Sequence, residues 1–116
     1  MEHKHDLSGF SVRQLRASRR RLAASLGDVE DLVAGRLIRQ ERRCGKPGCR
    51  CAQGPGHGPY TYLQVAGAGG RSRLVYVPAV LVEDVTARVD AHAAVQAVLG
   101  EISAINTELL TRRELG

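Results

Sequence analysis

Sixteen residues near the centre of this chain decide its fold, and they read Cys44-Gly-Lys-Pro-Gly-Cys49-Arg-Cys51-Ala-Gln-Gly-Pro-Gly-His57-Gly-Pro59. The stretch is so rich in glycine and proline that a helix or a central strand is excluded, and it must be a loop that something orders. All three cysteines of the chain lie in it. Three thiolates and one imidazole make a closed tetrahedral zinc set. The stretch therefore predicts one structural Zn²⁺ bound by Cys44, Cys49, Cys51 and His57.

The spacing of this cluster, C-x4-C-x-C-x5-H, differs from the paired C-x2-C spacing of the common DNA-reading zinc modules. It indicates a metal without indicating what the metal is for. Free, redox-active thiols and an iron-sulfur or other metal site are the alternatives, whereas the odd number of cysteines disfavours a structural disulfide. His3, His5 or a partner's side chain could replace His57 as the fourth ligand.

The segments on either side of this loop predict a small antiparallel sheet. Arg36–Arg43 is short and charge-rich, which is typical of an edge strand. Tyr60–Val65 and Arg71–Val77 both alternate, and a glycine-rich connection joins them, which predicts a β-hairpin. Pro78 ends the second hairpin strand, because the residue before a proline is held extended. We expect three strands around a zinc knuckle over residues 35–78.

Residues 1–10 show no periodicity and predict a flexible arm, and residues 11–34 predict a helical region that Ser11 caps. The apolar positions of this region share one helical stripe; they are Val12, Leu15, Leu22 and Leu26. Gly27 is expected to end the helix, and Asp28 to cap a short second helical segment over 29–34.

Residues 79–113 form the longest periodic segment. Alternating four- and three-residue steps mark an interface stripe, which consists of Leu81, Val85, His92, Val95, Leu99, Ile102, Asn106 and Leu109. Gly100 could break the segment into a helical hairpin; unbroken, the stripe favours a homodimer or a helical protein partner. The alternative is that the stripe packs on the N-terminal helix of its own chain.

The chain has 116 residues and a formal net charge of +5, so we expect one α+β domain over residues 11–116. The basic surplus lies entirely in residues 1–50, which favours a polyanionic partner such as nucleic acid. Two clusters could contact phosphates. The first consists of Arg13, Arg16, Arg19, Arg20 and Arg21, and the second of Arg39, Arg42, Arg43, Lys46 and Arg50.

The run G-R-L-I-R-Q-E-R-R-C-G-K-P-G-C-R-C-A over residues 35–52, followed by H-G-P-Y at 57–60 and V-Y-V-P at 75–78, resembles a family of small bacterial proteins catalogued as domain of unknown function 6788. The resemblance covers residues 35–110. It implies a zinc knuckle between strands, and it implies stand-alone proteins of which some are carried beside transposons and other mobile elements. It names no reaction.

These observations favour a zinc-stabilised nucleic-acid-binding accessory protein, with DNA preferred over RNA. The alternative is a protein-interaction module that recruits its partner through the C-terminal helix. No enzyme is expected, because residues 44–62 contain no carboxylate that could serve as a base. The chain has only four aromatic residues and no tryptophan, a poor supply for reading single strands by stacking. Without an apolar run of about 18–20 residues or a secretory signal, we expect a cytoplasmic protein.

Overall fold

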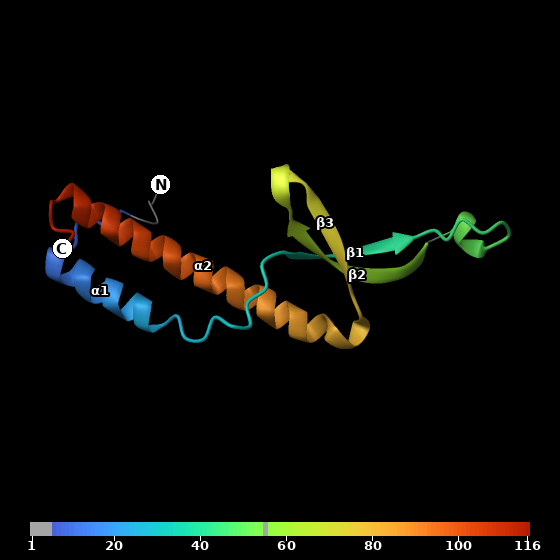
Figure 1. The fold of residues 1–116 in the computed structure, drawn as a ribbon, viewed down its shortest axis with the longest axis horizontal. Helices are drawn as coiled ribbons and strands as arrows, with labels where there is room; N and C mark the ends of the chain where they lie inside the picture. Colours follow the sequence, from blue (N-terminus) through green and yellow to red (C-terminus); the bar gives the residue numbers. More distant parts are fainter. Residues whose placement is uncertain (1–5, 55) are drawn as a thin grey trace. The chain divides into compact units, whose positions relative to one another are not determined.

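The computed structural model describes residues 6–54 and 56–116. The described chain is of the α+β class, as the sequence predicted (Figure 1). Its helices and strands are, in order, α1 (Val12–Ala24), β1 (Arg36–Arg42), β2 (His57–Ala66), β3 (Ser72–Val77) and α2 (Val82–Thr111). Single 3₁₀ turns occupy η1 (Arg50–Ala52), η2 (Ala68–Gly70) and η3 (Ala79–Leu81).

The chain divides into two compact units. The helical unit comprises the residues up to Asp31 together with Ala93–Gly116, and the strand unit comprises Leu32–His92. Helix α2 contributes residues to both units. At 1.5 Å per residue its 30 residues measure about 45 Å, so its two ends have different neighbours.

The helical unit is held together by a small apolar core. Ser11 caps α1 in a capping box, in which its hydroxyl accepts from the Gln14 amide while the Gln14 side chain accepts from the Ser11 amide. Leu15 of α1 is buried against Ile105 and Leu109 of α2. The stripe predicted on α1 therefore packs on the C-terminal part of α2 within the same chain.

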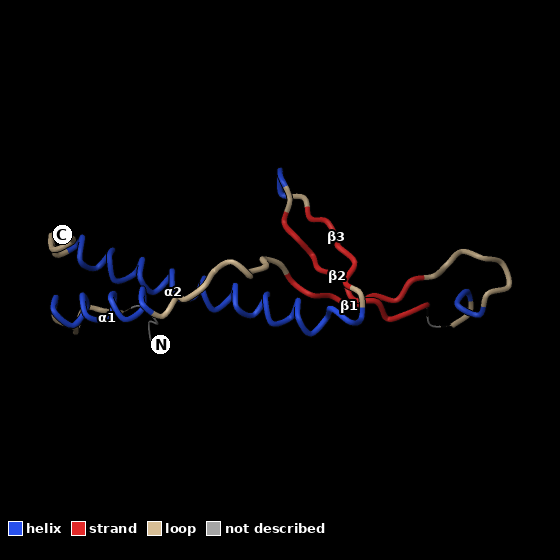
Figure 2. Tube along the Cα trace, turned by 60° about the horizontal axis from the view of Figure 1, so that its bottom comes forward, coloured by secondary structure: helices blue, strands red, loops and turns tan. Residues whose placement is uncertain are grey.

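The strand unit contains an antiparallel sheet in the order β1-β2-β3, whose strands and connecting loops are coloured separately in Figure 2. Directly opposite residues share a face. One face carries the buried Leu63 and Val77. Tyr62, which lies opposite Ile38 and Tyr76, belongs to the other face.

The edge strand and β3 lie within one residue of their predicted bounds. The central strand β2 begins at His57, three residues earlier than predicted and inside the glycine- and proline-rich stretch from which a central strand was excluded; pairing with β1 at Arg42 extends it.

Residues 29–34, expected to be helical, form a turn and an irregular segment. The Glu30 amide donates to the Asp28 carboxylate at 2.9 Å, and the Val33 amide donates to the Arg88 carbonyl at 3.3 Å. These partners replace the bonds that a helix would make, because Asp competes for nearby amides in turns.

Residues 79–113 do not form a hairpin. Helix α2 runs unbroken through Gly100, since a single glycine inside a helix costs only about 1 kcal/mol. No helix in the described part of the chain is long and apolar enough to cross a membrane.

Candidate metal centre

The pairing of β1 with β2 brings the four predicted ligands together. Arg42, the last residue of β1, lies opposite His57, the first residue of β2. Cys44 follows two residues after β1, while Cys49 and Cys51 lie in the loop that returns through η1. The antiparallel register thus closes a loop of which both ends carry a ligand.

The ligand atoms of these four residues all lie within 4.8 Å of one another. The Cys44 and Cys51 Sγ atoms are 3.4 Å apart, and the Cys49 Sγ atom is 3.4 Å from His57 Nε2. Tetrahedral zinc with Zn–S bonds of about 2.3 Å and Zn–N bonds of about 2.0–2.1 Å separates two sulfurs by about 3.8 Å. With the same bond lengths, tetrahedral zinc separates a sulfur ligand from a nitrogen ligand by about 3.6 Å. The cluster is therefore of the size and chemistry that could hold one metal ion, and His57 supplies its fourth ligand atom; His3 and His5 lie outside the described residues.

The loop backbone is shaped to present these ligands. Gly45 and Gly48 have φ angles of 73° and 79°, in the left-handed region that a glycine adopts at no steric cost. The Cys49 amide donates to the Lys46 carbonyl at 3.2 Å, which closes a tight turn between the first two ligands. Gly56 lies so close to β1 that a Cβ there would be 2.9 Å from the Arg42 carbonyl carbon.

The amides of the loop also set the acidity of the thiols. The Lys46 amide, followed by the side chains of His57, Cys51 and Cys49, lowers the pKa of Cys44 to about 6. Hydrogen bonds to a thiolate stabilise the charged form. The Cys51 amide lowers the pKa of Cys49, but the Cys51 and Cys44 thiol groups together with desolvation raise it by more, so the net shift is upward. One thiolate is thus available at neutral pH before any metal binds.

Burial differs among the four ligands. Cys51 is buried at 3% exposure, Cys49 is half-buried, and Cys44 and His57 are exposed. Beside them lies a hollow of about 570 Å³, which is lined by residues 50–51, 53–54 and 56–58. The cluster is therefore anchored on the Cys51 side and open on the His57 side.

The two predicted basic clusters belong to different units. The first cluster lies on α1 of the helical unit, where Arg16 donates to the Glu114 and Gly116 carbonyls and Arg19 donates to Asn106 at 2.8 Å. Those two side chains are thus partly engaged within the chain. The other members of this cluster, all exposed, are Arg13, Arg20 and Arg21.

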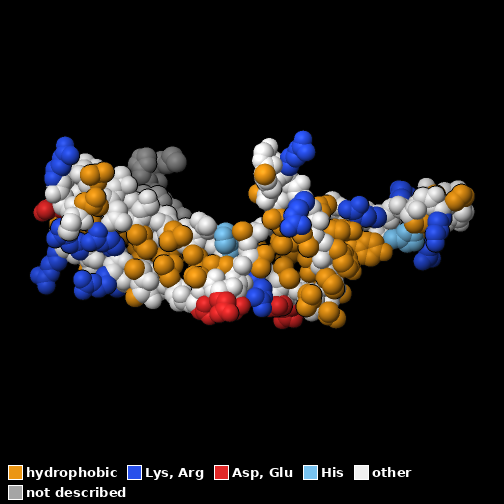
Figure 3. Space-filling view, viewed as in Figure 1, with side chains coloured by type: hydrophobic (Ala, Val, Ile, Leu, Met, Phe, Trp, Pro, Cys, Tyr) orange, Lys and Arg blue, Asp and Glu red, His pale blue; other side chains and the backbone are white. Residues whose placement is uncertain are grey.

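The second cluster lies on β1 and on the cysteine-bearing loop between β1 and β2, residues 43–54 and 56, which we call the metal loop. All of its members are exposed: Arg39, Arg42, Arg43, Lys46 and Arg50. Lys and Arg side chains are spread over the strands and the loop in Figure 3. The structure therefore brings this second cluster and the candidate metal centre onto one hairpin.

The predicted interface stripe divides along α2. Leu109 is fully buried in the intramolecular core and Asn106 accepts from Arg19, so neither side chain is open to a partner chain. Leu81 and Leu99 are exposed at 45% and 44%. The remaining members, Val85, His92, Val95 and Ile102, are half-buried.

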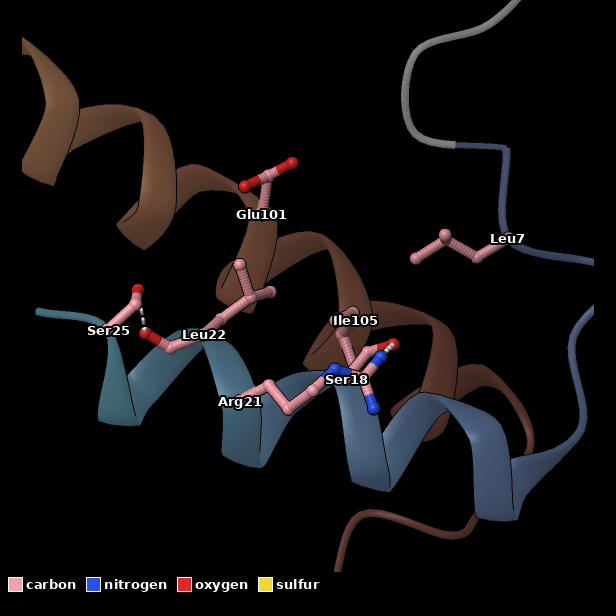
Figure 4. Close-up of a pocket in the computed structure, with 7 residues that line it drawn as sticks. All are labelled: Leu7, Ser18, Arg21, Leu22, Ser25, Glu101 and Ile105. Atoms are coloured by element: carbon pink, nitrogen blue, oxygen red, sulfur yellow. Dashed lines mark hydrogen bonds between the residues drawn. The ribbon is translucent and has the colours of Figure 1, made fainter.

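A second hollow, of about 330 Å³, lies between α1 and α2 in the helical unit (Figure 4). Its polar groups bond locally: Arg21 donates to the Ser18 hydroxyl, and the Ser25 hydroxyl donates to the Leu22 carbonyl. Glu101 also lines it. None of its lining side chains is a thiol or an imidazole, so it lacks the donors of the loop cluster.

Three tyrosines that no sequence motif grouped together, Tyr60, Tyr62 and Tyr76, lie on one face of the sheet. Their rings are in edge contact, with centroids of Tyr60 and Tyr62 at 6.3 Å and 5.8 Å from that of Tyr76. Alternation along β2 signals that Tyr60 and Tyr62 share a face. Only the register with β3 adds Tyr76.

Comparison with known proteins identifies a family and nothing more. The model of the family described as a domain of unknown function (DUF6788) matches residues 12–87, which is more than half of the chain. No curated protein and no solved structure matches the chain.

Proposed function

The chain belongs to the DUF6788 family, and we propose that it is a zinc-stabilised protein that binds nucleic acid, preferentially DNA. The role of the metal in this proposal is structural. Four protein ligands complete a tetrahedron and leave no position for a reacting water. Zinc suits three thiolates and an imidazole better than magnesium or calcium does, since those ions prefer oxygen ligands.

The observation that carries the DNA-binding proposal is the charge of the segment that the metal would order. Residues 35–78 contain eight Lys and Arg residues and one acidic residue, Glu41, for a formal charge of +7. A Cys3His zinc centre, formally −1, leaves this surplus almost intact. Arginine pairs with phosphate in a bidentate geometry. A hairpin with this charge is suited to a polyanionic backbone.

The second basic cluster sets the expected salt dependence. If its five members each neutralise one phosphate of duplex DNA, log Kd changes by about 4.5 for a tenfold change in salt. Affinity should then fall about 500-fold between 50 and 200 mM monovalent salt. Binding that rests on apolar contacts would change far less.

The proposal is tested on one metal-loaded preparation of the full chain. Metal content is measured by mass spectrometry, and binding of a fluorescent duplex is titrated by anisotropy at 50 and 200 mM salt, before and after chelation. We expect one zinc per chain and salt-sensitive binding that chelation abolishes. A double variant, Arg43→Gln with Lys46→Gln, should reduce the salt slope by about two. Arg113→Gln, outside both clusters, should leave it unchanged.

Zinc without binding of either duplex or single-stranded DNA at 50 mM salt would overturn the DNA proposal. The search would then turn to a protein partner for α2, whose Leu81 and Leu99 side chains are exposed. Binding with no metal in the preparation, unaffected by a chelator, would overturn the zinc proposal instead.

A further inference from the structure

The face of the sheet opposite Leu63 and Val77 combines aromatic rings with cations. Cross-strand pairing places three rows of side chains on it, and we call it the tyrosine face. Its members include Arg36, Gln40, Tyr60, Tyr62, Gln64 and Tyr76; Arg42 joins them because its guanidinium lies over the Tyr62 ring. All of the tyrosines in the chain lie on this face, and none of its members is buried.

The rings present accessible surface. Tyr76 is 54% exposed and Tyr60 is 38% exposed. Because Tyr76 meets both neighbouring rings in tilted, edge-on contacts, at 73° and 65°, the three rings form a contiguous aromatic patch. Every nucleobase has a π face, so such a patch accepts bases with little regard to sequence.

Arginines lie at both ends of β1 on this same face. The Arg42 guanidinium lies 4.7 Å from the centroid of the Tyr62 ring, and it donates to Gln40. Arg36 donates to Gln64 at 3.2 Å. Six residues of strand separate the two arginines by about 20 Å, a span along which phosphates can follow bases stacked between them.

The side chains that cross-strand pairing places on the tyrosine face include no carboxylate. Glu41, the one acidic residue in the strands, lies between Gln40 and Arg42, where the register of β1 against β2 shifts. Aromatic rings flanked by cations, without acidic groups, match a polyanion with unpaired bases. A duplex keeps its bases stacked on one another and offers no base face to the rings.

We propose that the tyrosine face binds single-stranded DNA, with two or three unpaired bases on the tyrosines and the phosphates near Arg36 and Arg42. This inference rests on the proposed nucleic-acid binding and specifies the form of the strand. A sheet that stacks two or three bases on its aromatic residues is an established mode of single-strand recognition. A small number of aromatic residues suffices for it when they share one face.

The experiment compares a twelve-nucleotide thymidine strand with a twelve-base-pair duplex, both labelled, on the metal-loaded full chain at one salt concentration. The chain has no tryptophan and all of its tyrosines lie on this face, so quenching of intrinsic tyrosine fluorescence reports directly on it. We expect the single strand to bind more tightly than the duplex and to quench this emission.

Tyr76→Ala removes the most exposed ring without opening the buried face of the sheet. Loss of one stacked base is worth about 1–3 kcal/mol, so single-strand affinity should fall at least about fivefold while duplex affinity stays within twofold. Tyr76→Phe should retain tight binding. Val75→Ala truncates the next residue of β3, which lies opposite Leu63 on the other face of the sheet and is 36% exposed; it should change single-strand affinity less than twofold.

Duplex binding that equals or exceeds single-strand binding, together with no effect of Tyr76→Ala, would overturn this inference and leave the proposed function standing. Binding of neither DNA would overturn the proposed function itself. An equal loss of duplex and single-strand affinity in Tyr76→Ala would show a structural effect and would also overturn the assignment of the tyrosine face.

Discussion

Chelation of the metal should unfold the metal loop while the helical unit stays folded. In the strand unit, the buried aliphatic side chains of the described chain are Leu63 and Val77, at 9% and 5% exposure. Burying each contributes about 1.5–3 kcal/mol, so the pair contributes about 3–6 kcal/mol. A structural zinc site contributes about 10–16 kcal/mol at neutral pH. Zinc binding would therefore contribute more free energy than the burial of these two side chains. The protection of the loop amides from exchange should depend most strongly on it.

Hydrogen exchange followed by mass spectrometry measures this effect segment by segment. In the structure the Cys44 amide donates to the Cys51 sulfur at 3.5 Å, and the Ala52 amide donates to the Cys49 carbonyl at 3.0 Å. After chelation, peptides covering residues 43–58 should exchange at least about a hundredfold faster. Peptides of α1, whose Leu15 packs in the other unit, should keep their protection.

Two variants control for effects of the chelator. Cys51→Ser should reproduce the fast exchange in the presence of zinc, whereas Ala52→Ser adds a hydroxyl at the next, exposed position and should exchange like the unmodified protein. Stoichiometric zinc with unchanged exchange of residues 43–58 after its removal would refute the reasoning. The metal would then contribute nothing to the order of the loop.

Three further outcomes follow from the packing and the charges. Leu109→Ala should destabilise the chain by about 3–5 kcal/mol in urea unfolding, because Leu109 is fully buried; a loss no larger than that of Leu99→Ala, at an exposed position, would contradict this. Gly100→Ala should raise the melting temperature, since a Cβ there meets nothing within 4 Å and alanine stabilises a helix interior by about 0.5–1 kcal/mol; a lower value would argue against a continuous α2. In metal-free protein at pH 7, iodoacetamide should alkylate Cys44 faster than Cys49. Its rate should fall as the pH drops through about 6, because the thiolate is the nucleophile; equal rates by peptide mass spectrometry would contradict the pKa difference.

The strands and the close approach of the four candidate metal ligands could be predicted from the sequence because their signals are local. Alternation marks a strand within six residues, and a proline or a glycine-rich connection marks its end. The ligands are separated by one to five residues, so the chain itself holds them near one another. The hairpin of β2 and β3, the edge strand β1 and the convergence of Cys44, Cys49, Cys51 and His57 all follow from such short-range information.

The errors arose where a local signal competes with a distant partner. Asp28 precedes residues 29–34 as a helix cap would, yet the Val33 amide donates its hydrogen bond to the Arg88 carbonyl of α2. The apolar stripe over residues 79–113 left open a partner chain or the chain's own N-terminal helix. At the C-terminal end of the stripe, Leu109 packs on α1 of the same chain. A side chain that is fully buried there has no surface left for a partner chain.

By itself, the sequence determined most helices and strands of this protein, the spacing of its candidate cysteine and histidine ligands and the excess of positive charge in its first half. Tertiary structure alone decided which side chains share a surface. A count of four aromatic residues indicated a weak stacking surface, but strand register places Tyr60, Tyr62 and Tyr76 together and adds Arg36 and Arg42. The physical reason is that a shift of one residue in register moves every side chain of a strand to the other face, and register depends on partners that are distant in the chain.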